Sequence, residues 1–219
     1  MSSSFGSTPA SAPVSAPGSA PVSARLPRLG ALSGVLSGLL IALPALVEAF
    51  TGETATTSLL LALAPAFALP FLTAVHQWQS PATGRFGETA YIVNTIGLGL
   101  FGGAAFASNL VLFYLDADVI EAELTGPTVP ALIGSAIVFA AGCAMFGAAT
   151  IRAGRFPKVP SWGYAVALPL FAFLIALPDS VFTSMLHIVV GATLTWLATA
   201  LWRSAGTTDR TSAPDRSPA

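Results

Sequence analysis

The chain has 219 residues and a formal net charge of −1, and only 9% of its residues are charged whereas 54% are hydrophobic. Because soluble domains carry about 25% charged residues, this composition indicates a membrane protein with several spans. The near-neutral charge excludes a strongly basic nucleic-acid surface, and the single cysteine, Cys143, excludes an internal disulfide and a cysteine-based zinc cluster. We expect Cys143 to be a small buried apolar residue, since it lies in an apolar run.

The first 28 residues form a tail of low complexity. Residues 1–24 carry no charge, and from Ser11 the chain repeats S-A-P-V, S-A-P-G and S-A-P-V. So few large apolar side chains cannot offset the entropy lost on ordering, and residues 1–28 are therefore predicted to be disordered. No basic region adjoins a short apolar core there, as a cleaved signal peptide requires.

Residues 29–50 are the first predicted membrane-spanning helix. They carry no charge before Glu48, and at about 1.5 Å per residue they are long enough to cross a hydrocarbon core of roughly 30 Å. Gly30, Gly34 and Gly38 recur every four residues and so share one helical face. Because a stripe of small residues lets a second helix approach closely in lipid, we expect helix packing on this face.

Five more apolar stretches complete an all-α bundle of six predicted transmembrane helices over residues 29–202. They cover residues 57–78, 90–115, 130–151, 162–178 and 181–202. A polar link is expected between the second and third helices at residues 79–88, and an acidic loop at residues 116–123 precedes the fourth. Residues 203–219 are polar and contain Pro and Ser, so we predict a second disordered tail.

Two of these helices contain residues that shape their geometry. Pro65 and Pro70 predict a kink in the second helix, because each proline lacks a backbone donor and clashes with the preceding turn. Gly99 and Gly103 lie four residues apart in the third helix. They predict a second face for close helix packing.

The basic residues predict how the chain is oriented. If the N-terminus is in the cytoplasm and the helices alternate, all 9 Lys and Arg residues fall on the cytoplasmic side. The outer side then collects only acidic groups, which are Glu53, Asp116, Asp118, Glu121, Glu123 and Asp179. This distribution follows the positive-inside rule. We therefore expect a multi-pass protein of the plasma membrane, surrounded by the lipid bilayer, with both termini in the cytoplasm.

Polar side chains at membrane depth are the candidates for a functional site, because they are costly in lipid and mark sites of function. Four lie near the outer surface, and they are Glu48, Asn109, Ser135 and His187. Just above them lie Asp179, Thr183 and Ser184. If the helices turn the right faces inward, these side chains form one outward-facing polar pocket. In the alternative interpretation, Glu48 extends to the outer interface and His187 makes an interhelical hydrogen bond.

The sequence also excludes several cofactor and metal sites. His76 and His187 are the only histidines, and they fall in opposite leaflets, so they cannot ligate one haem iron. No predicted helix contains the lysine that a retinal Schiff base needs. The spacings typical of metalloproteases, phosphate-binding loops and dinucleotide-binding folds are absent. We expect no cofactor and no bound metal.

Two non-hydrolytic functions are compatible with this sequence. The first is a non-catalytic module that binds a helix, a protein subunit or a lipid through its glycine faces, with a second copy or another membrane protein as partner. The absence of recognisable catalytic chemistry favours this function. The second is a small proton-linked transporter in which Glu48 and His187 titrate and proline-broken helices line the substrate site. With so few helices, the transporter would need to dimerise.

The third interpretation is an intramembrane serine hydrolase. A serine near the outer end of the fourth helix and a histidine on the sixth resemble the layout of rhomboid-like intramembrane serine proteases, and a serine nucleophile needs such a base. The chain departs from that family's motifs, because Ser135 stands in the sequence G-S-A and the closely spaced glycines expected after His187 are missing.

Overall fold

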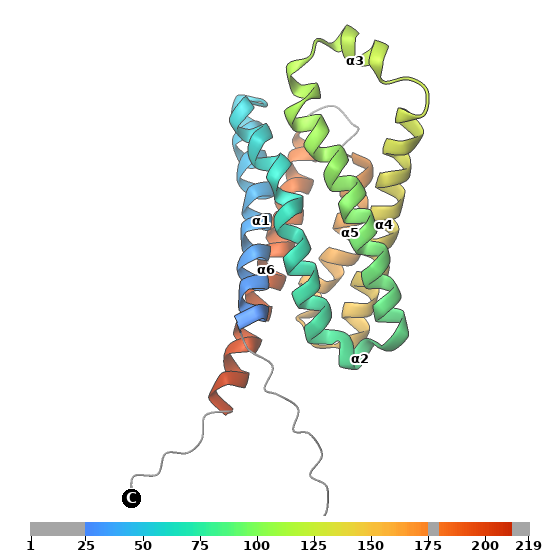
Figure 1. Ribbon diagram of the computed structural model, residues 1–219. Helices are drawn as coiled ribbons and strands as arrows, with labels where there is room; N and C mark the ends of the chain where they lie inside the picture. The colour runs from blue at the N-terminus through green and yellow to red at the C-terminus, as the bar shows by residue number, and fades with distance from the viewer. Residues whose placement is uncertain (1–24, 175–179, 212–219) are drawn as a thin grey trace, which may run out of the picture.

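The computed structural model describes residues 25–174 and 180–211, and in these residues all regular secondary structure is helical (Figure 1). The elements are α1 (Arg25–Thr51), α2 (Ala55–Leu110), the 3-10 helix η1 (Leu112–Tyr114), α3 (Ala117–Glu123), α4 (Thr128–Ala153), α5 (Lys158–Leu174) and α6 (Val181–Thr211). Four described stretches have the length and hydropathy to cross a membrane, namely Arg25–Thr51, Ala55–Tyr114, Thr128–Ala153 and Val181–Gly206. The predicted all-α membrane bundle is confirmed.

α2 is a hairpin of two helical halves. Among its 56 residues only Gly84 has non-helical backbone angles, with φ 54° and ψ −155°. A positive φ favours glycine, which has no Cβ, and the chain reverses direction at this point (Figure 1). The first half is residues 55–83 and the second half is residues 85–110. The polar link predicted at residues 79–88 was therefore wrong in extent, because the helix continues on both sides of Gly84.

The prolines of α2 do not interrupt the helix. The backbone angles at Pro65 and Pro70 are helical, so the helix continues through the two positions where a kink was predicted. Two hydroxyls of α1 donate hydrogen bonds to carbonyl oxygens in this stretch, Ser33 Oγ to Phe67 at 2.7 Å and Ser37 Oγ to Ala64 at 2.9 Å. These bonds join α1 to the first half of α2.

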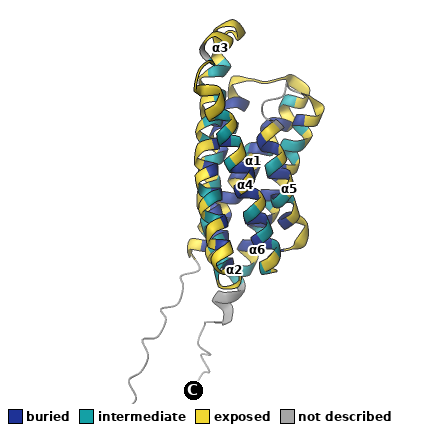
Figure 2. Cartoon of the chain, turned by 90° about the vertical axis from the view of Figure 1, so that its right-hand side faces the viewer, coloured by how far each residue is buried: buried dark blue, intermediate teal, exposed yellow. Residues whose placement is uncertain are grey.

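Six helical segments of the described chain stand in a ring, and they are α1, the two halves of α2, α4, α5 and α6. α1 packs against α2 and α6, α4 packs against α2 and α5, and α5 also packs against α6. In Figure 2 the residues coloured as buried lie mainly where the segments face one another, and those coloured as exposed lie mainly on the outside. Many exposed side chains are large and apolar, among them Leu29, Ile92, Ile133 and Trp162. An apolar outer surface of this extent fits contact with lipid tails.

Several helix boundaries differ from the prediction. α1 begins at Arg25, inside the tail predicted at residues 1–28, and Pro27 lies in its first turn, where proline is tolerated. α6 continues to Thr211, inside the tail predicted at residues 203–219, because Ala205 is still buried in the bundle. Residues 1–24, 175–179 and 212–219 lie outside the described residues. The structure therefore does not test the disorder predicted for the two ends or the last turn predicted for the fifth helix. The acidic loop contains the short helix α3.

The predicted glycine face of α1 lies against two neighbouring helices. A Cβ on Gly34 would stand 2.5 Å from the ring of Phe71 in α2 and 2.8 Å from the Cβ of Ala198 in α6. Gly30 has a similarly close contact with α2, and Gly38 has one with α6. This face is therefore occupied by packing within the bundle.

The second predicted glycine face does not pack against another helix of the described bundle. A Cβ on Gly99 or on Gly103 would meet nothing within 4 Å, and both residues are exposed. The second half of α2 instead approaches α4 at Gly97, where a Cβ would stand 2.5 Å from the Cα of Phe139. Gly97 is two residues from Gly99, so it lies on nearly the opposite side of the helix. The sequence shows the four-residue spacing of Gly99 and Gly103, but it did not predict which side of the helix packs against a neighbour.

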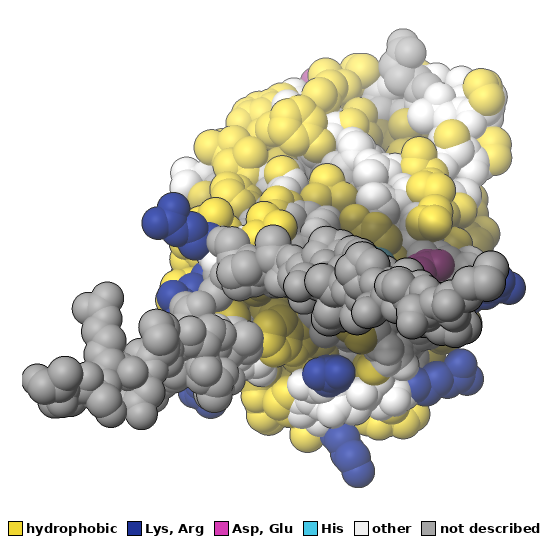
Figure 3. Space-filling view, turned by 60° about the horizontal axis from the view of Figure 1, so that its bottom comes forward, with side chains coloured by type: hydrophobic (Ala, Val, Ile, Leu, Met, Phe, Trp, Pro, Cys, Tyr) yellow, Lys and Arg dark blue, Asp and Glu magenta, His cyan; other side chains and the backbone are white. Residues whose placement is uncertain are grey.

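The two ends of the bundle carry opposite charge. The starts of α1 and α5, the turn at Gly84, the end of α4 and the last turns of α6 share one end, which we call the basic end (Figures 1 and 3). It carries Arg25, Arg28, Arg85, Arg152, Arg155, Lys158 and Arg203. The opposite, acidic end carries Glu53, Asp116, Asp118 and Glu121. Basic side chains therefore predominate at one end of the described bundle, and acidic side chains predominate at the other.

Candidate functional site

A cavity of about 310 Å³ opens at the acidic end of the ring. This volume lies at the lower end of the range of about 300–1,000 Å³ that is typical of small-molecule sites. The cavity is lined by Ile41, Glu48, Glu53, Leu61, Ala64, Pro65, Phe101, Ala105, Ser108, Asn109, Leu112, Phe113, Ile120, Phe171, Thr183 and His187. Its walls come from α1, both halves of α2, η1, α3, α5 and α6, so most segments of the ring contribute to it.

The cavity brings together three of the four polar residues predicted to form a pocket. Glu48 comes from α1, Asn109 from the second half of α2 and His187 from α6. Ser135 does not line the cavity. It is buried in α4, and its Oγ donates a hydrogen bond of 2.7 Å to the carbonyl oxygen of Leu132 in the preceding turn. A hydroxyl inside a helix commonly makes this bond.

The orientation of His187 is set by its own helix and by α5. Its Nδ1 lies 2.8 Å from the carbonyl oxygen of Thr183, which also lines the cavity. Because a carbonyl only accepts hydrogen bonds, Nδ1 carries the proton and Nε2 is the acceptor of the neutral ring. The ring of Phe171 stands edge-on to the imidazole, with 4.7 Å between the centroids. His187 is thus held against an apolar wall.

Asn109 is held by a bond within its own helix. Its Nδ2 donates a hydrogen bond of 2.8 Å to the carbonyl oxygen of Ala105, one turn earlier in α2. The side chain remains half-buried and lines the cavity. Its amide can both donate and accept hydrogen bonds. It therefore adds a neutral polar group to the lining that also contains Glu48 and Glu53.

Glu53 is a second carboxylate in the lining, which the sequence had assigned only to the outer surface. It lies in the connection between α1 and α2, and its Oε1 accepts a hydrogen bond of 2.6 Å from Ser58 Oγ. Thr54 and Thr57 cap the start of α2, because each side chain accepts a hydrogen bond from the other's backbone N–H, at 3.2 Å and 2.9 Å. This arrangement is a capping box. The cap places Glu53 at the rim of the cavity.

The floor of the cavity is aromatic. Phe101 lies against Phe139, with ring centroids 4.4 Å apart, and it meets Phe171 edge-on at 5.9 Å. Below these rings lies a second, apolar cavity of about 40 Å³, which shares Ile41, Pro65, Phe101 and Phe171 with the first. The two cavities are therefore neighbours along the axis of the bundle, and Phe101 and Phe171 line both of them.

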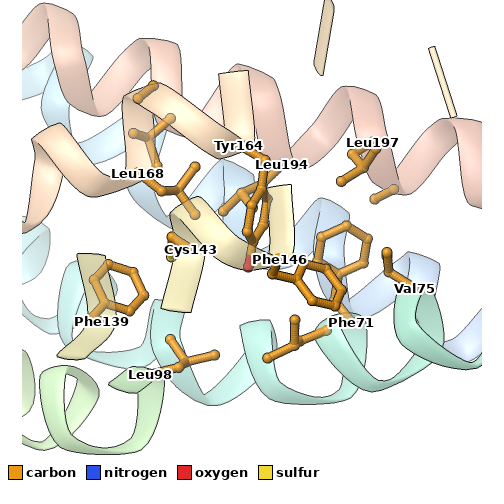
Figure 4. Packing of buried hydrophobic residues seen from close by; sticks show 14 of the residues in the cluster. Phe71, Val75, Leu98, Phe139, Cys143, Phe146, Tyr164, Leu168, Leu194 and Leu197 are labelled. Carbon is orange, nitrogen blue, oxygen red and sulfur yellow. The ribbon is translucent and has the colours of Figure 1, made fainter. Parts of the chain in front are cut away.

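A buried polar cluster lies beside this second cavity, and the sequence did not predict it. Asn94 Nδ2 donates a hydrogen bond of 2.7 Å to the hydroxyl of Tyr164, and Cys143 Sγ donates to Asn94 Oδ1 at 3.3 Å. Figure 4 shows Tyr164 and Cys143 among the buried aromatic and aliphatic side chains. The bonds join α2, α5 and α4. The signal was available, since Asn94 is an amide in an otherwise apolar run.

The described residues show no other arrangement with chemistry of its own. In this part of the chain no group of three or more His, Cys, Asp and Glu side chains is placed to hold a metal ion. His76, the second histidine, stacks on Tyr91 with 4.2 Å between the ring centroids. Comparisons of the chain with models of protein families, with curated proteins and with solved structures find no match. The fold and the cavity define a helical membrane protein with a polar cavity at its acidic end.

Proposed function

We propose that the protein is a small transporter of the plasma membrane that binds its substrate in the cavity at the acidic end. The observation that carries this proposal is the convergence of Glu48, Asn109 and His187 on one cavity from three different segments of the ring. Polar and ionisable groups at membrane depth are costly and typically serve substrate or proton pathways. Glu48 and His187 are the groups that would take up and release protons in a proton-linked cycle.

The charge of the two ends supports an orientation for this transporter. The basic end belongs in the cytoplasm by the positive-inside rule, which places both termini there and opens the cavity to the outside. The acidic end then faces the exterior. The cavity would be the outward-open state of the transporter.

The second cavity supports transport rather than simple binding. It continues from the first toward the basic end, and the two cavities share Ile41, Pro65, Phe101 and Phe171 in their linings. Pro65 lines both cavities, while Pro44 and Pro169 lie within α1 and α5. Transporters commonly form their substrate sites where helices contain such residues, because movement of one part of the bundle against another can open the site to either side.

The experiment that tests the proposal is thiol labelling from both sides of the membrane. Ala68 lines the second cavity, so Ala68→Cys is expected to react with a membrane-impermeant thiol reagent in intact cells and also in inside-out vesicles. Ala66→Cys is the matched control, because Ala66 lies on the same helix but is exposed on the lipid side. The native Cys143 is fully buried and can stay. Reaction of Ala68→Cys from neither side would contradict a transport cycle.

A partner-binding membrane module is the second candidate function. Gly99 and Gly103 lie on the exposed face of α2 with open space around them, and Ala107 continues this face. A small-residue face of this kind allows a helix of a second copy or of another protein to approach closely. If the protein is such a module, Gly103→Leu should disturb its assembly and Glu48→Gln should not. A transporter should show the reverse order in its activity.

The hydrolase interpretation gains no support from the geometry. Ser135 does not share the cavity with His187, and its hydroxyl is bonded to the carbonyl of Leu132. A serine nucleophile needs a base within hydrogen-bond distance. We therefore do not propose a serine hydrolase.

A further inference from the structure

We infer that the ligand of the cavity is a monovalent organic cation with an apolar or aromatic tail. The inference rests on the proposed transport function and names the class of substrate. The cationic group would lie beside Glu48 and Glu53, and the tail would lie against the aromatic floor formed by Phe101 and Phe171.

The charge of the lining selects the sign of the ligand. Two carboxylates, Glu48 and Glu53, line the cavity together with one histidine, His187, and none of its described lining residues is Lys or Arg. The two carboxylates outnumber the histidine even when its ring is protonated. The described basic side chains gather at the opposite end of the bundle (Figure 3). A cleft lined by charges of one sign and walled by apolar groups concentrates ligands of the opposite sign. The cavity therefore favours cations over anions.

The aromatic lining favours an organic cation. Phe101, Phe113 and Phe171 contribute ring surfaces to the cavity. The face of an aromatic ring attracts an ammonium group and also contacts an apolar tail. Most of the remaining lining is aliphatic, as at Ile41 and Leu61. A small cation that keeps its water shell would gain little from these walls.

The carboxylates are not arranged for a divalent metal ion. Glu53 is bound to Ser58, as described above, and no cluster of three or more ligating side chains is present in the described residues. Calcium requires about six to eight oxygen ligands, and magnesium requires near-octahedral oxygen geometry. An organic cation with a single, delocalised charge does not require such a set of oxygen ligands. The same carboxylates therefore suit an ammonium ion.

The shape of the cavities fits a ligand with a charged head and an apolar tail. The carboxylates lie toward the open, acidic end, and the aromatic floor lies between this cavity and the smaller apolar one. A head group beside Glu48 and Glu53 would orient the tail toward Phe101 and Phe171. Movement of these two rings would then admit the tail to the second cavity, on the path toward the basic end.

Binding of matched probes to the full-length protein tests this inference. Benzyltrimethylammonium, tetramethylammonium and phenylacetate are titrated calorimetrically into protein in phosphatidylcholine nanodiscs, with empty nanodiscs as the blank. Benzyltrimethylammonium is expected to bind at least about tenfold more tightly than tetramethylammonium, because it adds ring contacts. Phenylacetate is expected not to bind. Equal or tighter binding of phenylacetate would overturn the inference.

Two carboxylate variants locate the site. Glu48→Gln and Glu53→Gln are each expected to weaken benzyltrimethylammonium binding by about tenfold, because each removes one of the two carboxylates that line the cavity. Asp118→Asn is the matched control, since Asp118 is an exposed carboxylate of α3 outside the cavity and its loss should leave the affinity unchanged. Glu53 lies in an exposed connection, so its variant keeps the test valid if Glu48→Gln fails to fold. Unchanged binding in a folded variant contradicts the assigned site.

The substrate class and the transport function can fail separately. If no cation binds although Ala68→Cys reacts from both sides of the membrane, the inferred ligand class is wrong and the transport proposal stands. If benzyltrimethylammonium binds although Ala68→Cys reacts from neither side, the ligand class stands and the transport proposal is wrong.

Discussion

The amide of Asn94 and the hydroxyl of Tyr164 are joined by a hydrogen bond of 2.7 Å that links α2 to α5 inside the bundle. Both side chains are buried, and the Asn94 amide also accepts a hydrogen bond from Cys143 in α4. One amide therefore connects three helices at a depth where water does not compete. We expect this cluster to stabilise the part of the bundle beside the second cavity.

Asn94→Leu should lower the stability of the bundle by about 1–2 kcal/mol, because it removes an interhelical bond and leaves the Tyr164 hydroxyl buried without its donor. Tyr164→Phe should cost a similar amount, since it leaves the buried Nδ2 of Asn94 without its acceptor. The free energy of unfolding is measured by denaturant titration in micelles for both variants and for the double variant. If the two changes add without coupling, the bond does not contribute to stability.

Gly97 and Gly99 should respond oppositely to the same substitution. Gly97→Ala forces a Cβ against the backbone of Phe139 and should destabilise the protein by about 1–3 kcal/mol. Gly99→Ala places its Cβ in open space and should leave the stability unchanged or slightly raised. Thermal unfolding in micelles compares the two variants. Equal destabilisation by both would contradict the helix faces described above.

Gln79 is fully buried in the first half of α2, and its side-chain amide has no hydrogen-bond partner among the described residues. Gln79→Met keeps the length of the side chain and removes the buried polar atoms. It should raise the free energy of unfolding by about 1 kcal/mol. Gln77→Met, at an exposed position two residues away, is the control. A loss of stability in Gln79→Met would show that a bound water or another polar group satisfies the amide.

Phe171 should control passage between the two cavities. In the Ala68→Cys background, Phe171→Leu shortens the side chain between the cavities and should speed labelling from the acidic end by about tenfold, a change of about 1.4 kcal/mol in the barrier. Phe173→Leu is the control on the same helix, because Phe173 is exposed on the outer surface. Labelling rates that do not change in Phe171→Leu would contradict a gating position.

The sequence predicts the helices well because a spanning helix is recognised from the length of an apolar run and the polar residues at its ends. A long apolar run such as residues 29–50 has few alternatives in lipid to a spanning helix. The depth of a residue along a helix follows from its position in that run, and the structure does bring Glu48, Asn109 and His187 to the same end of the bundle. Depth was therefore predictable from helical rise alone.

The direction in which a side chain points could not be predicted in the same way. Ser135 has a similar predicted depth, but it faces away from the cavity, and Gly99 faces outward where Gly97 faces α4. These directions depend on which helices become neighbours, and no local pattern in the chain specifies that. Glu53 was missed for a related reason, since its place in the lining depends on the cap at the start of α2.

We expect water to enter the cavity that the polar residues of the acidic end surround. Ser108 lines this cavity and Phe106, two residues earlier in α2, is exposed on the outside of the bundle. The most direct test is the rate at which a charged, membrane-impermeant thiol reagent modifies Ser108→Cys and Phe106→Cys in intact cells. Rapid modification of Ser108→Cys and none of Phe106→Cys is expected. An unreactive Ser108→Cys, or equal rates at the two positions, would contradict it.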